Sequence, residues 1–222
     1  MSTEIVPGQA PETALALAQP KYADEASFLA VSSGGGFLPR VMLMNSSSNA
    51  VKEALIQQGN YALVQGKDNR DLTKEVVVQP VSWRPRAMEI NDGEIISAFN
   101  PKSAEFKRIQ EKSDESDSGC MFGPEFLVWV PSVKVWATFF MASKTARRVA
   151  PEMREILNQK KVATLKSALI KGKKYSWWGP VITLCSQPID PFDAEELREI
   201  AEKFANPPET ESEPAEPESR PR

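Results

Sequence analysis

The stretch GPEFLVWVPSVKVWATFFMAS, residues 123–143, holds two runs rich in aromatic and β-branched residues, separated around Pro131 and Ser132. Residues of these types favour pleated strands over helices. In the second run, apolar residues at the odd positions 133–139 alternate with a mixed set at positions 134–140, which is the two-residue period of a strand. Both runs predict strands, and we therefore expect a β-rich body built around them.

Short apolar runs elsewhere extend this β-rich body. Further strands are predicted at residues 37–44, 60–66, 74–83 and 93–99. A hairpin turn is expected at residues 67–70, and Pro80 indicates an edge strand or a bulge because proline has no backbone N–H to donate. Residues 163–187 are interpreted as two strands turning near Gly172, with a helix as the alternative for residues 163–170.

Helices are expected between these strands. One is predicted at residues 49–58 and ends at Gly59, and a second begins at Pro101 and covers residues 101–113. A third covers residues 144–159 with an interruption at Pro151. Because the helices interrupt the strands irregularly, without βαβ alternation, the sequence predicts an α+β fold. Its expected architecture is a partly open antiparallel barrel, like the oligonucleotide-binding (OB) barrel, with inserted helices and disordered termini.

The ends of the chain differ in composition from this body, which we place at residues 37–189. Residues 1–36 mix Pro, Ala, Gln and Ser and are predicted to form a flexible arm. Residues 190–205 predict an acidic amphipathic helix that packs on the body through Leu197, Ile200 and Phe204. Residues 206–222 are rich in Pro and Glu without apolar anchors, so a disordered tail is expected there.

Several kinds of chemistry are disfavoured by composition. The 222 residues include no histidine, which removes the commonest general base and metal ligand. The two cysteines, Cys120 and Cys185, do not form a Cys-x-x-Cys metal motif. They are predicted to be reduced thiols, with a disulfide as the alternative. The sequence also contains no phosphate-binding loop of the Gly-x4-Gly-Lys-Ser/Thr type. We expect no enzyme activity, no cofactor and no bound metal.

Charge is distributed unevenly along the chain. The formal net charge is −3, yet residues 134–174 contain eleven Lys or Arg and only two acidic residues. Residues 190–222 contain eleven acidic and four basic residues. Such a basic block followed by an acidic end is typical of proteins that bind polyanions.

Aromatic residues lie among the basic ones in KGKKYSWWGP, residues 171–180. In a strand, Lys171, Lys173, Tyr175 and Trp177 share one face, whereas Lys174 and Trp178 lie on the other, where Trp178 is expected to enter the core. Binding of single-stranded nucleic acid needs cations along the phosphates and flat rings under the bases. The full set of candidate binding residues is Trp83, Arg84, Arg86, Lys144, Arg147, Arg148, Lys171, Lys173, Lys174, Tyr175 and Trp177.

This layout resembles the single-stranded DNA-binding proteins of bacteria and their viruses. The shared features are a β-rich body, basic and aromatic strand faces and an acidic C-terminus, and the runs DSGCMFGPEFLVWVPS and WATFFMASKTARR look like those of small tailed-phage proteins. The resemblance implies an OB-like fold, a role in DNA replication or recombination, and contact with replication proteins through the tail. In that family the tail commonly ends in an aromatic residue, whereas this chain ends Ser219-Arg-Pro-Arg222.

The sequence therefore predicts a non-enzymatic protein that binds single-stranded nucleic acid, with DNA as the first candidate and RNA as the alternative. The alternative is a viral structural or assembly protein that buries its aromatic strands in a protein interface. An enzyme based on a lysine or carboxylate-bound Mg²⁺ is a third hypothesis. No run of about 18 apolar residues is present, so we expect no membrane partner. The expected location is the cytoplasm, of the host if the protein is viral, and a homo-oligomer is compatible with the sequence.

Overall fold

The two strands predicted from residues 123–143 form a hairpin in the centre of the sheet. Strand β6 (Cys120–Val130) pairs antiparallel with β7 (Val135–Phe140), with Trp129 opposite Trp136. The computed structural model describes residues 38–65, 68–91, 94–115, 118–173 and 175–206. The predicted arm at residues 1–36 and the tail beyond residue 206 lie outside the described residues.

Strands make up most of the described secondary structure. Besides β6 and β7, they are β1 (Arg40–Leu43), β2 (Tyr61–Gln65), β3 (Asp68–Thr73), β4 (Glu75–Asn91), β5 (Glu94–Ala98), β8 (Val162–Lys171) and β9 (Ser176–Cys185). The helices are α2 (Asn49–Lys52), α3 (Ala104–Lys112), α4 (Lys144–Arg148), α5 (Ala150–Asn158) and α6 (Ala194–Ala205). The α+β class with a strand-rich body is thereby confirmed.

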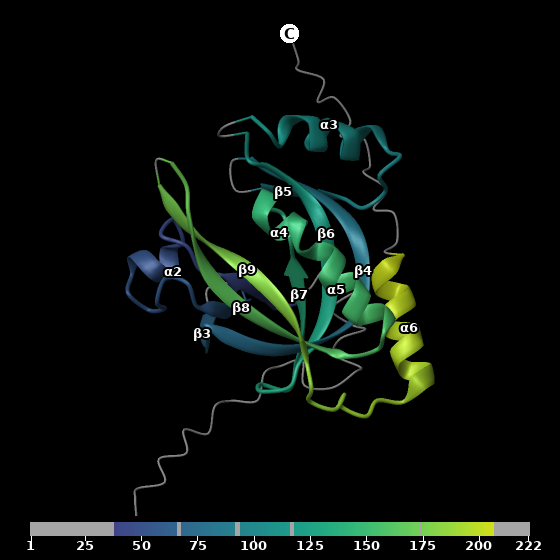
Figure 1. The fold of residues 1–222 in the computed structure, drawn as a ribbon. Helices are drawn as coiled ribbons and strands as arrows, with labels where there is room; N and C mark the ends of the chain where they lie inside the picture. The colour runs from purple at the N-terminus through teal and green to yellow at the C-terminus, as the bar shows by residue number, and fades with distance from the viewer. Residues whose placement is uncertain (1–37, 66–67, 92–93, 116–117, 174, 207–222) are drawn as a thin grey trace, which may run out of the picture.

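The nine described strands form one sheet in the order β3-β2-β1-β7-β6-β4-β8-β9, with β5 added to the far end of β4 (Figure 1). The described pairings are antiparallel except that β1 runs parallel to β7. Because the described β3 and β9 have no strand between them, the sheet is open at these two edges. The predicted barrel was partly open, and the described strands form an open sheet rather than a closed barrel.

The long strand β4 connects the two halves of the sheet. Its first residues pair with β8, its middle with β6 and its last residues with both β6 and β5. The register shifts between Pro80 and Ser82, so the bulge predicted at Pro80 is present. The strand is central rather than an edge strand, because it lies between β6 and β8. It tolerates Pro80 because the ladder to β6 is interrupted at that position.

Helices cover both faces of the sheet (Figure 1). On one face, α4 and α5 bury Ala146, Met153 and Ile156 in the main core, where Phe126 and Leu165 are fully buried. On the other face, α6 packs Ile200 and Phe204 against Leu127 and Trp136, as the spacing of its apolar residues predicted. Helix α3 covers one end of the sheet through Phe106 and Ile109.

Several predicted boundaries are wrong, and strand β4 continues to Asn91 rather than ending at residue 83. The first helix ends at Lys52 rather than at residue 58, because Ala54 adopts a left-handed φ of 56° that breaks it. The next helix begins at Ala104, where the Ser103 side chain accepts a hydrogen bond from the Phe106 amide and so caps it. Residues 68–70 of the predicted hairpin turn belong instead to strand β3, which begins at Asp68.

Residues 163–170, for which a helix was the alternative, belong to strand β8. Cys120 and Cys185 are free thiols. In the described part of the chain, no helix combines the length and apolar character needed to cross a bilayer.

Candidate nucleic-acid interface

The β8–β9 hairpin presents basic and aromatic side chains at its closed end. Lys171 pairs with Ser176 across the hairpin, and the Gly172 amide donates to the Tyr175 carbonyl over 3.0 Å. Tyr175 is 72% exposed, and its ring centre lies 5.7 Å from that of Trp177. Lys173 is exposed next to this pair in the sequence, and Lys174 lies outside the described residues. The prediction that Lys171 shares a face with Tyr175 and Trp177 is wrong, because β8 ends at Lys171 and the exposed Lys171 pairs with Ser176, on the other face of the hairpin from Trp177. The hairpin end thus offers an open ring with neighbouring ammonium groups.

Trp177 and Trp178 lie on opposite faces of β9, as strand alternation predicted. Trp177 is half-buried, and its Nε1 donates to the Thr145 hydroxyl of α4 over 3.2 Å. Trp178 is also half-buried, with Gly59 packed against its ring and its amide donating to Asn45 Oδ1 over 3.0 Å. The expectation that Trp178 enters the main core is therefore corrected, because it fills the space between β9 and the loop before β2.

Helix α4 carries three of the predicted phosphate-binding residues. Lys144 is exposed and forms an ion pair of 3.0 Å with Asp114, and Arg148 is exposed. Arg147 turns inwards, where one terminal nitrogen donates to the carbonyls of Phe122 and Ala142 over 2.9 and 2.8 Å. Burial lowers the pKa of Arg147 below its ordinary value, and the carboxylate of Asp114 opposes that shift. Lys144 and Arg148 are therefore the surface cations of this helix.

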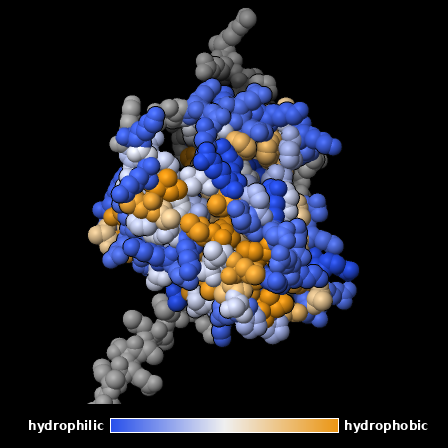
Figure 2. All heavy atoms as spheres, in the orientation of Figure 1, coloured by the Kyte–Doolittle hydropathy of each residue, from blue (hydrophilic) through white to orange (hydrophobic). Residues whose placement is uncertain are grey.

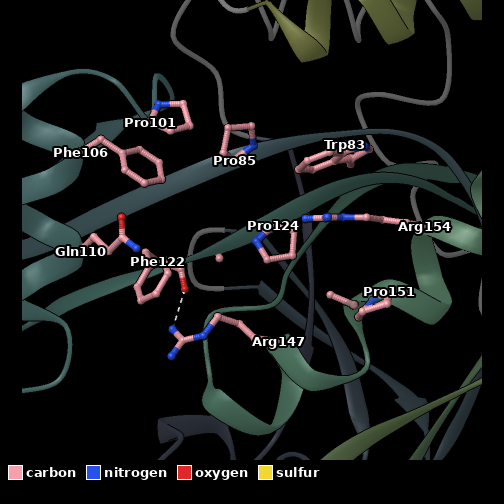
Figure 3. A pocket seen from close by; sticks show the side chains of 12 residues that line it. Trp83, Pro85, Pro101, Phe106, Gln110, Phe122, Pro124, Arg147, Pro151 and Arg154 are labelled. Carbon is pink, nitrogen blue, oxygen red and sulfur yellow. Dashed lines mark hydrogen bonds between the residues drawn. The ribbon is translucent and has the colours of Figure 1, made fainter.

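Trp83 lines a separate open pocket of about 390 Å³ between β4, β6, α3, α4 and α5 (Figure 3). Its indole is 36% exposed, and the guanidinium carbon of Arg154 lies 3.8 Å from its ring centre. Arg147 reaches the same pocket and lies 4.1 Å from the ring centre of Phe122. Sequence reasoning missed Arg154 as a site residue, since its only signal was its membership of the basic block at residues 134–174.

The sequence prediction grouped Trp83 with Arg84 and Arg86, and the structure divides them. Both arginines point to the opposite face of β4, where they pair with the fully buried carboxylate of Glu125. Arg84 also donates to the Phe204 carbonyl at the end of α6 over 3.1 Å. Burial lowers the pKa of Arg84, and the charge of Glu125 opposes the shift. Arg84 therefore holds α6 on the sheet, and neither arginine shares a surface with Trp83.

The predicted residues that do come together meet at α4. Thr145 binds Trp177 of the hairpin, and Arg147, two residues further along, lines the Trp83 pocket. Apolar patches lie over β8 and β9 on this side of the molecule and are bordered by hydrophilic residues (Figure 2). The side chains that contribute exposed apolar surface on these strands are Leu169, Val181 and Leu184.

Chemically, this side of the molecule offers cations, exposed aromatic surface and a hollow. Within the described residues, no group of three or more acidic or cysteine side chains forms a metal-binding cluster. The structure thus defines a strand-rich α+β protein with an open sheet and a basic, aromatic surface. No known protein family, curated protein or solved structure matches the chain. The basic, aromatic surface is therefore the feature that bears on function.

Proposed function

We propose that the protein binds single-stranded nucleic acid, DNA in the first instance, without enzymatic activity. The binding surface consists of Lys171, Lys173, Tyr175 and Trp177 from the hairpin with Lys144 and Arg148 from α4, and we call it the hairpin–helix surface. The observation that supports it best is the hydrogen bond between Trp177 Nε1 and Thr145 Oγ1. That bond holds the aromatic pair of the hairpin against the helix that carries the two cations.

The physical requirements of a single strand match this arrangement. A strand exposes its phosphates at regular intervals, and its bases are free to stack on flat rings. Tyr175 presents an open ring, and a base stacked on such a ring contributes about 1–3 kcal/mol. Lysine and arginine near the ring neutralise the phosphates on either side of that base, which releases counterions and makes the affinity depend on salt.

Two contacts support an OB-like arrangement of the open sheet as part of this proposal. The Tyr61 hydroxyl on β2 donates to the Lys166 carbonyl on β8 over 3.0 Å, and the Trp178 amide on β9 donates to Asn45 after β1. Side chains therefore bridge the two ends of the sheet where backbone pairing is absent in the described residues. A curved strand face of this kind is what OB proteins use to bind oligonucleotides.

The biological setting is proposed from the resemblance to the single-stranded DNA-binding proteins of bacteria and their viruses. We infer a role in DNA replication or recombination in the cytoplasm, or in the host cytoplasm for a viral protein. Replication proteins are the proposed partners of the acidic residues after position 206, and self-association is compatible with the exposed edge of β9.

The test is a fluorescence anisotropy titration of the full chain with labelled oligo-dT over a range of salt concentrations. We expect a linear fall of log affinity with log salt, and K171Q/K173Q should reduce that slope by about 0.7 for each phosphate that is no longer neutralised. The matched control is K134Q/K161Q, which removes two exposed lysines near the opposite end of β8. Absence of binding at low salt, or equal effects of the two double variants, would contradict the proposal.

A second candidate function, a viral structural or assembly protein, is favoured by one observation. Strand β9 is an edge of the described sheet and exposes Val181 and Leu184, the latter 52% exposed. Exposed apolar residues on an unpaired edge suit burial in a protein interface. Size-exclusion chromatography distinguishes the two functions: a large oligomer that resists salt and does not bind oligo-dT favours assembly.

A further inference from the structure

The pocket beside α4 combines flat apolar walls with unpaired positive charge. We call it the Trp83 pocket and define it by Trp83, Phe106, Gln110, Phe122, Arg147 and Arg154. In Figure 3 the rings of Phe106 and Phe122 lie on one side and Trp83 with Arg154 on the other, with proline rings between them. Its volume of about 390 Å³ lies within the range of about 300–1,000 Å³ that is usual for small-molecule sites.

The two arginines of the pocket lack an acidic partner. Among the described residues, neither Arg147 nor Arg154 has a carboxylate within ion-pair distance. The Nε of Arg154 is buried and makes no hydrogen bond. That nitrogen is covered by protein atoms and meets no ligand, whereas the two guanidinium charges, which no described carboxylate neutralises, suit an anionic ligand. The charge of the pocket is therefore available for a phosphate.

We propose that the Trp83 pocket holds one unstacked nucleobase of the bound strand, with the adjoining phosphate at Arg154 and Arg147. This inference rests on the proposed function and names the ligand of a specific subsite. The base stacks on the exposed part of the Trp83 ring, with Phe122 beside it, and stacking stabilises it there. The side-chain amide of Gln110 has both donors and an acceptor, which suit the polar edge of a base.

The position of α4 connects this pocket with the hairpin–helix surface. Thr145 and Arg147 stand on the same five-residue helix, one bound to Trp177 and the other lining the pocket. Lys144 and Arg148 are exposed on that helix, so a strand passing from the hairpin to the pocket meets cations on its way. The geometry gives the strand two kinds of contact: open stacking on Tyr175 and enclosed binding of one base at Trp83.

A proline-rich peptide is the other ligand that aromatic walls would suit, since such peptides dock in grooves lined by aromatic rings. The two guanidinium charges that have no carboxylate partner among the described residues favour a phosphate-bearing ligand instead. A peptide therefore enters the experiment as a competing outcome.

The experiment measures binding of dTMP and of thymidine to the full chain by two-dimensional NMR titration. We expect dTMP to shift the resonances of pocket residues, and thymidine to bind at least tenfold more weakly because it lacks the phosphate. R154Q should weaken dTMP binding at least tenfold, and Q110A at least threefold. Gln110 is exposed on α3, so Q110A keeps the test valid if R154Q fails to fold. R198Q, which removes an exposed arginine of α6 that does not line the pocket, is the matched control that leaves dTMP binding unchanged.

The outcomes separate this inference from the proposed function. If oligo-dT binds but dTMP causes no shift and neither pocket variant weakens the strand, the pocket inference is overturned and strand binding stands. If dTMP binds through Arg154 but oligo-dT does not bind, the pocket is a mononucleotide site, and both the proposed function and the strand subsite are overturned. If a peptide with the sequence of residues 207–222 shifts the pocket resonances and dTMP does not, the pocket is a peptide site and the inference is overturned.

Discussion

Arg84 lies directly opposite Glu125 in the β4–β6 ladder, and its Nε donates to that buried carboxylate over 2.8 Å. Arg86, two residues along β4, pairs with the other oxygen of the same carboxylate. Aromatic rings enclose the group, since Arg84 lies 4.0 Å from the ring centre of Phe99 and 4.1 Å from that of Phe204. One buried anion therefore holds two cations and, through Phe204, the last turn of α6.

Replacement of Glu125 by glutamine removes this anion at nearly constant volume. Two half-buried or buried guanidiniums then lack a counter-charge, and breaking a buried pair in this way costs about 3–5 kcal/mol. We expect the free energy of unfolding of E125Q to fall by that amount, measured by urea denaturation. The control is E75Q, which breaks the exposed Lys166–Glu75 pair and should cost about 0–1 kcal/mol. Equal effects of the two variants would show that the buried pair contributes no more than a surface pair.

The pair of Glu89 and Arg108 predicts a dependence of stability on pH. A hydrogen bond from Arg108 is the main cause that lowers the pKa of Glu89 in the folded protein, helped by the charges of Arg108 and Lys112. Because the folded pKa lies below the unfolded value, the stabilisation is complete above the unfolded pKa and is lost as pH falls through the folded one. In acid denaturation, R108Q should therefore have a flatter acid limb than the wild type. An unchanged slope below pH 5 would contradict this assignment.

Strand alternation, applied to the sequence alone, accounts for much of the candidate site. It places Trp177 and Trp178 on opposite faces of β9, as found. The grouping of Trp83 with Arg84 and Arg86 did not follow this rule and is wrong, since the two arginines lie on the other face of β4 from Trp83. The sequence could not tell which face is covered, because both carry apolar and basic residues.

The contacts that join distant segments could not be predicted from the sequence. Arg154 stacks on Trp83 across 71 positions of the chain, and Thr145 binds Trp177 across 32 positions. No local pattern encodes either distance, since both depend on how α4 and α5 pack on the sheet. The amphipathic helix α6 was predictable because Leu197, Ile200 and Phe204 share a face at helical spacing.

Tyr175 offers the clearest separation of binding from stability. Its side chain is largely exposed at the hairpin end and contacts Trp177 alone among the described rings. Y175A should leave the free energy of unfolding within about 0.5 kcal/mol of the wild type, as for other surface substitutions. Its affinity for oligo-dT should fall by about 1–3 kcal/mol, the value of one stacked base, whereas Y175F should retain it. Anisotropy titration gives the affinity, and an equal loss in both variants would assign the effect to the hydroxyl.

The two adjacent tryptophans of β9 should respond to truncation in opposite ways. Trp178 packs on Gly59, whose φ of +88° and close approach to the indole leave no room for a Cβ atom, since one would lie 2.6 Å from the ring. W178A therefore opens a cavity beside a strained turn, and we expect about 2 kcal/mol of destabilisation, roughly half the cost of a fully buried tryptophan.

Trp177 makes its main contact with Thr145 on the hairpin–helix surface, so W177A should weaken oligo-dT binding by about 1–3 kcal/mol. Its effect on the free energy of unfolding should be smaller than that of W178A, because the hydrogen bond that the substitution removes is worth about 1 kcal/mol. Urea denaturation and anisotropy titration of both variants give the two comparisons. If both variants lose stability equally and bind oligo-dT equally, the two faces of β9 do not divide packing from binding, and Trp177 leaves the proposed surface.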